Sequence, residues 1–148
     1  MTQYAGVRSL CVGGFVGKPL LDHLQYLFPA LDDVLSIARL DGRTPEDTYA
    51  DIRAANQPAQ DGEGGGLCSR AWKKVDRVVC DAPTLYILGL RCPVRLLRLD
   101  CCSAHALRYA ADALRENPVP RLKVSLLLGD GLRGLNELCG EELAGRLT

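Results

Sequence analysis

The strongest pattern of hydrophobic and polar positions lies in residues 94–102, VRLLRLDCC. This segment matches the leucine-rich-repeat signature L-x-x-L-x-L-x-x-N/C, with valine at the first leucine position. Because alternate residues of a strand point to opposite faces, Leu97 and Leu99 are expected to point inward. Arg98 and Asp100 then face outward on the other side. The pattern predicts a short strand that is buried on one face and polar on the other.

Further copies of the pattern lie on both sides of this segment. Residues 75–80, VDRVVC, place Val, Val and Cys at the first three signature positions, 19 residues earlier, which is about one short repeat. Residues 7–12, VRSLCV, repeat the pattern more loosely, and residues 31–37, LDDVLSI, contain one residue more than it requires. Residues 121–128, RLKVSLLL, begin with alternating apolar and polar positions. The sequence therefore predicts five short strands with irregular spacing.

Apolar residues at helical spacing separate these strands. The clearest helix is predicted over residues 103–117, with Ser103 as N-cap and an Asn-Pro pair as its stop. Residues 82–90 predict a shorter helix, with proline near its start and glycine near its end. Residues 19–28 and 132–143 carry leucines on one helical face. The alternation of strands and helices predicts an α/β fold with parallel strands on one side and helices on the other.

The middle of the chain interrupts this pattern. Residues 41–66, DGRTPEDTYADIRAANQPAQDGEGGG, are polar, net acidic and rich in Gly and Pro. Thr44, Pro45 and Asp47 suit the N-cap, N1 and N3 positions of a short helix. We interpret the segment as a flexible polar insertion, partly helical at most, with residues 56–66 disordered. A functional loop is the alternative interpretation.

Outward-facing side chains on adjacent strands form one common face, which in stacked-repeat proteins is a binding surface. Arg77, Arg98 and Lys123 are predicted to line a partner-binding stripe on this face, alongside Asp100. An acidic peptide is the natural ligand for such a basic stripe, and RNA is a weaker alternative. The other interpretation is that these side chains are solvated repeat positions without a partner.

Composition narrows the classes of function. The chain has 18 Lys and Arg residues and 18 Asp and Glu residues, a formal net charge of zero. This balance argues against broad electrostatic binding of nucleic acid or of an anionic membrane. No stretch approaches the roughly 18 apolar residues that span a bilayer, and the N-terminus has no signal-peptide pattern. We therefore expect a single domain over residues 1–148, located in the cytoplasm or the nucleus.

Residues that carry metal or redox chemistry are sparse. The seven cysteines are an odd number without a C-x-x-C pair, and only His23 and His105 accompany them. Neither a zinc site nor a disulfide framework is predicted, and the cysteines are expected to be buried free thiols. A dyad of Cys101 and His105 is a minor alternative. We predict no catalytic residue, no metal and no cofactor.

A glycine-rich turn at residues 13–18, GGFVGK, invites comparison with phosphate-binding loops. Aligning the motif GxxxxGK[ST] on Gly17 and Lys18 puts Val12 where its first glycine belongs. Pro19 then stands where Ser or Thr would hold the metal. A plain turn between a strand and a helix is the favoured interpretation.

Two sequence runs carry a resemblance to a known family. Residues 72–80, WKKVDRVVC, and residues 84–101, TLYILGLRCPVRLLRLDC, resemble the divergent leucine-rich-repeat region of fungal F-box-associated proteins. The resemblance covers residues 67–128 and, more loosely, the first 40. It implies a curved α/β solenoid that recruits a protein, in some members for ubiquitination. The family's F-box is a separate helical segment ahead of the repeats, and here Val7 already begins a predicted strand. The role of ligase adaptor is therefore not carried over.

These observations predict a scaffold for protein–protein recognition. The first alternative is a small enzyme on a doubly wound α/β sheet, because βαβα alternation alone does not separate the two. The second is a fragment of a longer repeat protein, whose uncapped apolar ends would lead to self-association. A strand order that runs sequentially across the sheet favours the solenoid, whereas an order that reverses at a switch point favours the enzyme.

Overall fold

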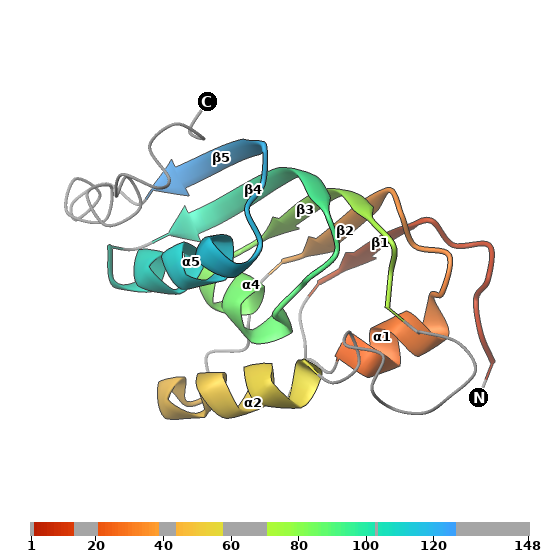
Figure 1. Ribbon diagram of the computed structural model, residues 1–148, viewed down its shortest axis with the longest axis horizontal. Coiled ribbons are helices and arrows are strands. Elements are labelled where there is room, and N and C mark those ends of the chain that lie inside the picture. The colour runs from red at the N-terminus through yellow and green to blue at the C-terminus, as the bar shows by residue number, and fades with distance from the viewer. Residues whose placement is uncertain (1, 14–20, 39–43, 58–70, 103, 127–148) are drawn as a thin grey trace.

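The fold is α/β, with a five-stranded, all-parallel sheet (Figure 1). The computed structural model describes residues 2–13, 21–38, 44–57, 71–102 and 104–126. The strands follow one another across the sheet in the order β1-β2-β3-β4-β5. They are β1 (Ser9–Val12), β2 (Val34–Ile37), β3 (Val75–Cys80), β4 (Val94–Cys102) and β5 (Arg121–Leu126).

The helices lie on one side of this sheet, and the other face carries none in the part of the chain that the structure describes (Figure 1). Helix α2 lies furthest from the strands, packed against α4. Each strand is therefore buried on one face only. The helical segments are α1 (Leu21–Leu27), the 3-10 turn η1 (Glu46–Thr48), α2 (Tyr49–Asn56), α4 (Ala82–Leu88) and α5 (Ala104–Glu116).

The strand register coincides with the repeat alignment read from the sequence. Val75 pairs with Val94, and Val78 pairs with Leu97, which are the matching signature positions of the two copies. All four side chains are buried. A strict strand alternation would put the first signature position on the opposite face from the second, yet Val75 and Val94, the first residues of β3 and β4, are also buried. The 19-residue spacing is therefore one structural unit, a strand with its following helix.

The column of inward residues extends across the whole sheet. In strand order, its members are Leu10, Leu35, Val78, Leu97 and Leu122, each paired with the next. The three central strands and β5 bury this position almost completely, whereas Leu10 on the edge strand is half-buried. The five strands therefore share one continuous hydrophobic core with the helices.

Helix α4 shows how local sequence determines an element. Asp81 is its N-cap, and the carboxylate accepts a hydrogen bond from the backbone N–H of Thr84 at 2.9 Å. Pro83 occupies the first turn, where a missing N–H costs nothing. Gly89 ends the helix in the left-handed conformation, with φ of 56°, which glycine adopts without strain. The predicted start of this helix is confirmed, and the helix ends at Leu88, two residues before the predicted end.

The segment predicted as a flexible insertion differs from the structure over residues 44–57. This stretch forms η1 and α2, and Pro45 rather than Thr44 precedes the first helical residue. Asn56, predicted to lie in a disordered stretch, is buried, accepts a hydrogen bond from the Leu21 N–H and donates one to the Ile87 carbonyl, each 2.9 Å long. A polar sequence was read as solvated, but its polar groups satisfy buried backbone groups of two other helices.

Arg53 is the second buried polar residue of α2. Its guanidinium donates to the backbone carbonyl of Tyr86 and forms an ion pair with Glu116 of α5. It also lies 4.7 Å from the centre of the Tyr86 ring, in cation–π geometry. Arg53 thus links three helices, and with the buried Ile52 it packs α2 against the helical side.

Several other predictions are refined by the structure. The last strand begins at Arg121, as predicted, and Val119, Leu122 and Val124 before and within it are buried or half-buried. Among the described cysteines, Cys80 is buried as predicted, but Cys11 is exposed on the edge strand. The predicted helix over residues 132–143 and the predicted cap Ser103 lie outside the described residues.

Candidate functional site: the uncovered face of the sheet

The face of the sheet without helices carries the side chains that alternate with the core positions. In one row across the strands the register joins Val34, Arg77, Leu96 and Arg121. In the next row it joins Ser36, Val79, Arg98 and Lys123. Adjacent strands lie about 4.8 Å apart, so neighbours within a row are close enough to act on one ligand.

The predicted stripe residues all lie on this face. Arg98 pairs in register with Lys123, and Arg77 lies one strand away in the neighbouring row. Asp100, two residues beyond Arg98 on the same strand, accepts a hydrogen bond from the Arg98 Nε at 2.9 Å. The sequence analysis did not single out Arg121, which lies beside Leu96 on the same face. The four cations Arg77, Arg98, Arg121 and Lys123 are named the basic patch below.

The charge of the sheet face rises from one edge to the other. On β1 and β2 the described outward positions are Ser, Cys and Val, whereas β3 to β5 present the basic patch together with Asp100. All four cations of the patch are exposed. This half of the face is therefore a local basic surface on a chain whose formal net charge is zero.

Other arginines near the sheet are neutralised by partners. Arg8 and Asp32 form a bidentate pair, with Nε 2.8 Å from the carboxylate, and Arg95 and Asp76 form another at 2.6 Å. The hydrogen bonds from Arg8 and Arg95 lower the pKa of the two carboxyl groups below their usual range. Each of these pairs balances one positive with one negative charge, although its side chains are partly exposed, as are those of Arg98 and Asp100.

The basic patch is less completely neutralised. Within the described part of the chain, no carboxylate forms an ion pair with Arg121 or Lys123, and Arg77 has only a longer-range attraction to Asp76. Arg98 alone has a partner on this face, the exposed pair with Asp100. Exposed pairs of this kind contribute little and break readily. The patch therefore retains cationic groups that an anionic partner would neutralise.

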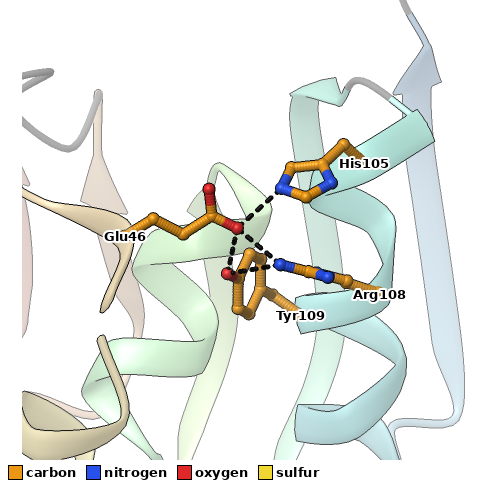
Figure 2. A network of polar contacts seen from close by, with 4 residues as sticks. All are labelled: Glu46, His105, Arg108 and Tyr109. Atoms are coloured by element: carbon orange, nitrogen blue, oxygen red, sulfur yellow. Dashed lines mark hydrogen bonds and ion pairs between the residues drawn. The ribbon is translucent and has the colours of Figure 1, made fainter. Parts of the chain in front are cut away.

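A second polar cluster lies on the opposite, helical side of the molecule (Figure 2). Glu46 of η1 points toward three side chains of the first turns of α5, and one oxygen, Oε1, accepts from all of them. The His105 Nε2 lies 2.6 Å from this oxygen, the Arg108 Nη2 2.5 Å, and the Tyr109 hydroxyl donates to it as well. These four residues are named the Glu46 cluster below.

The Glu46 cluster stabilises the charged form of its carboxylate. The hydrogen bond from Tyr109, followed by those from His105 and Arg108, lowers the pKa of Glu46 to about 2. Conversely, burial together with the bond to Glu46 raises the pKa of the Tyr109 hydroxyl. An acceptor with three donors and so low a pKa holds no proton near neutral pH, so Glu46 is suited to joining η1 to α5 and not to general acid or base catalysis.

Sequence reasoning missed the Glu46 cluster for a simple reason. His105, Arg108 and Tyr109 are spaced i, i+3 and i+4, so their common helical face was readable. The partner, Glu46, is 59 residues from His105, in the segment predicted to be flexible. Among the described residues there is also no group of three His, Cys, Asp or Glu side chains that could hold a metal ion.

Two candidate motifs are not described by the structure. The glycine-rich turn is described only at Gly13, and the side chain of Cys101 from the predicted dyad is outside the described set. His105 itself is exposed and bound to Glu46. No helix among the described residues is long and apolar enough to cross a membrane.

The fold and the two polar surfaces define an α/β protein with a sequentially ordered parallel sheet, helices on one face and a partly basic surface on the other. Comparisons with known proteins do not assign this chain to a family. The chain matches no protein-family model, and searches of curated proteins and of solved structures gave no match.

Proposed function

We propose that this protein is a recognition scaffold that binds a protein partner through the uncovered face of its sheet, without a cofactor. The observation that carries this proposal is the basic patch, in which the predicted residues Arg77, Arg98 and Lys123 lie together, with Asp100, on an exposed face. The partner segment is acidic, because carboxylates complement the patch.

Stacking of leucine-rich-repeat-like units in a solenoid is part of the same proposal. The sequential strand order and the in-register signature positions support it. Burial of the first signature position in three units, at Leu31, Val75 and Val94, and again at Val119, adds further support. In such a stack, outward positions of successive strands form one continuous surface, which suits an extended ligand. A link to ubiquitin ligases rests on the sequence resemblance alone and stays an untested hypothesis.

The enzyme hypothesis has weaker support. Doubly wound α/β enzymes bind substrates where the strand order reverses, and the five described strands show no reversal. One cavity among the described residues, between the sheet and the helices and lined by Arg53, Asn117 and apolar side chains, has a volume of about 10 Å³. This volume suits one water molecule, not a substrate.

A displayed library of protein fragments from the native host tests the proposed function. We expect fragments retained by the wild-type protein to be lost on the variants Arg98→Glu and Lys123→Glu. Arg115→Glu is the matched control, since it changes the net charge equally but lies on α5, exposed on the helical side. The proposal is overturned if retained fragments bind the two sheet-face variants as well as the wild type, or if single-stranded RNA binds there in preference to any fragment.

A further inference from the structure

The basic patch surrounds two apolar side chains that the sequence analysis did not assign. Leu96 lies in one row with Arg77 on one side and Arg121 on the other, and Val79 lies beside Arg98 in the next row. Leu96 and Val79 both point to the uncovered face, yet both are half-buried. They lie at the centre of the patch, and its cations form the rim.

The partial burial of Leu96 has its origin in the neighbouring side chains. Among the described residues no helix lies over this face (Figure 1), and the in-register neighbours of Leu96 are Arg77 and Arg121. Long arginine side chains cover apolar surface with their aliphatic stems while their guanidinium groups stay in water. A ligand that draws these guanidinium groups outward would expose Leu96 for contact.

An apolar centre with a charged rim has the organisation of a binding hot spot. Contact energy at interfaces is concentrated in central apolar groups, which the rim shields from water. The rim here is cationic on three sides of Leu96, through Arg77, Arg98 and Arg121. The complementary group is an apolar side chain flanked by carboxylates on both sides.

We infer that Leu96 and Val79 form the anchor position of the sheet face, and that the partner is a protein segment with an apolar side chain between acidic residues. This inference rests on the proposed function and adds the specificity of the site. The basic patch attracts the segment and holds its carboxylates, and the anchor selects the apolar residue.

Asp100 sharpens this specificity. It is an outward carboxylate of β4, and it accepts a hydrogen bond from the Arg98 guanidinium at 2.9 Å. A ligand carboxylate must therefore compete with Asp100 for Arg98, whereas Arg121 and Lys123 carry no such competitor among the described residues. Asn at position 100 removes this competition and should strengthen binding.

Three labelled peptides provide the test by fluorescence anisotropy at low and at physiological salt. The first has the core Asp-Asp-Leu-Asp-Asp between Gly-Ser flanks, the second has Ser in place of Leu, and the third has Asn in place of every Asp. We expect the first peptide to bind about tenfold more tightly than the second, roughly the effect of burying two methylene groups. The third should show no measurable binding.

Variants assign the effect to the anchor. Leu96→Ser should weaken the leucine peptide about tenfold and leave the serine peptide unchanged, while Asp100→Asn should strengthen both. A Leu→Ser substitution in the core, such as Leu35→Ser, cannot serve as the control because Leu35 is buried. The control is again the exposed variant Arg115→Glu. Circular dichroism of each variant shows that the fold is retained.

The outcomes separate this inference from the proposed function. Equal binding of the leucine and serine peptides, or no effect of Leu96→Ser, overturns the anchor but leaves the recognition of acidic segments standing. Binding that survives Arg98→Glu and Lys123→Glu overturns both. Failure of all three peptides, while host fragments are still retained through the basic patch, overturns only the inferred ligand chemistry.

Discussion

The two sides of this sheet use the same kinds of side chain in different ways. On the helical side, arginines and carboxylates bind one another or the backbone: Arg53 joins Tyr86 and Glu116, and Glu46 receives three donors. On the uncovered side, cations lie next to one another, with Asp100 among them. A polar group whose partners lie within the chain stabilises the fold, and one that lacks them is available to a ligand.

The apolar residues on the two sides of the sheet also differ in how deeply they are buried. Neighbouring residues of β4 point to opposite sides: Leu97 is buried at 1% exposure, whereas Leu96 is half-buried among cations. The inward leucine belongs to the hydrophobic core cluster, and the outward one is not part of it. Substitutions at this pair of neighbours measure directly what each face contributes.

The largest effect is expected from the substitution Leu97→Ala. Removing a fully buried leucine from the core should lower the free energy of unfolding by about 2–5 kcal/mol. Leu96→Ala is the matched variant, and it should cost about 1 kcal/mol or less because its site is open to solvent on one side. Urea denaturation of both variants checks this. Equal losses would mean that the outward face is covered in solution.

Arg53→Ala should give the next largest effect. The substitution removes a buried side chain, leaves the Tyr86 carbonyl without a donor and breaks the link to Glu116. A loss of roughly 2 kcal/mol is expected, the scale of an unsatisfied buried acceptor with loss of packing. Arg115→Ala, an exposed arginine of α5, should change stability by no more than about 0.5 kcal/mol. If the two variants are equally stable, α2 contributes nothing to the fold and the predicted flexible insertion regains support.

The sequence allowed most of the sheet to be predicted and little of the helical polar network. Strand positions followed from a local pattern, because burial of Val78 and Cys80 on one face needs only period-two geometry. The outward positions of Arg77, Arg98 and Lys123 followed from the same alternation of inward and outward residues along each strand. Their common surface could be predicted because adjacent strands in a repeat are also adjacent in sequence.

The contacts of α2 could not be predicted in that way. Asn56 bonds to Leu21 and Ile87, and Arg53 to Glu116, over 31 to 63 residues. Polar composition indicates solvent exposure unless buried partners are known, and these partners lie on other helices. No role was predicted for Leu96, although the alternation that directs Leu97 inward places Leu96 on the outward face.

A smaller effect is expected from the pH dependence of the Glu46 cluster. The carboxyl group of Glu46 has a pKa of about 2 in the folded protein, against an ordinary value of 4.5. Because the folded pKa is lowered, the contribution is fully present above pH 4.5 and is lost as the pH falls toward 2. Glu46→Gln should therefore lower the melting temperature at pH 7 and have no effect at pH 2. A difference between variant and wild type that is the same at both pH values would show that the ionised carboxylate is not what joins η1 to α5.

The smallest effect on stability is expected for a substitution on the uncovered face. Whether stability rises or falls there tests whether the two sides of the sheet differ in their charge partners. Lys123 pairs in register with Arg98, and like charges on neighbouring strands repel each other. Lys123→Glu replaces this repulsion with attraction, so it should raise the melting temperature slightly while it abolishes partner binding. Lys123→Gln should give an intermediate melting temperature. A loss of stability in Lys123→Glu would show that Lys123 already has an anionic partner within the chain, and the basic patch would then be a closed network like the Glu46 cluster.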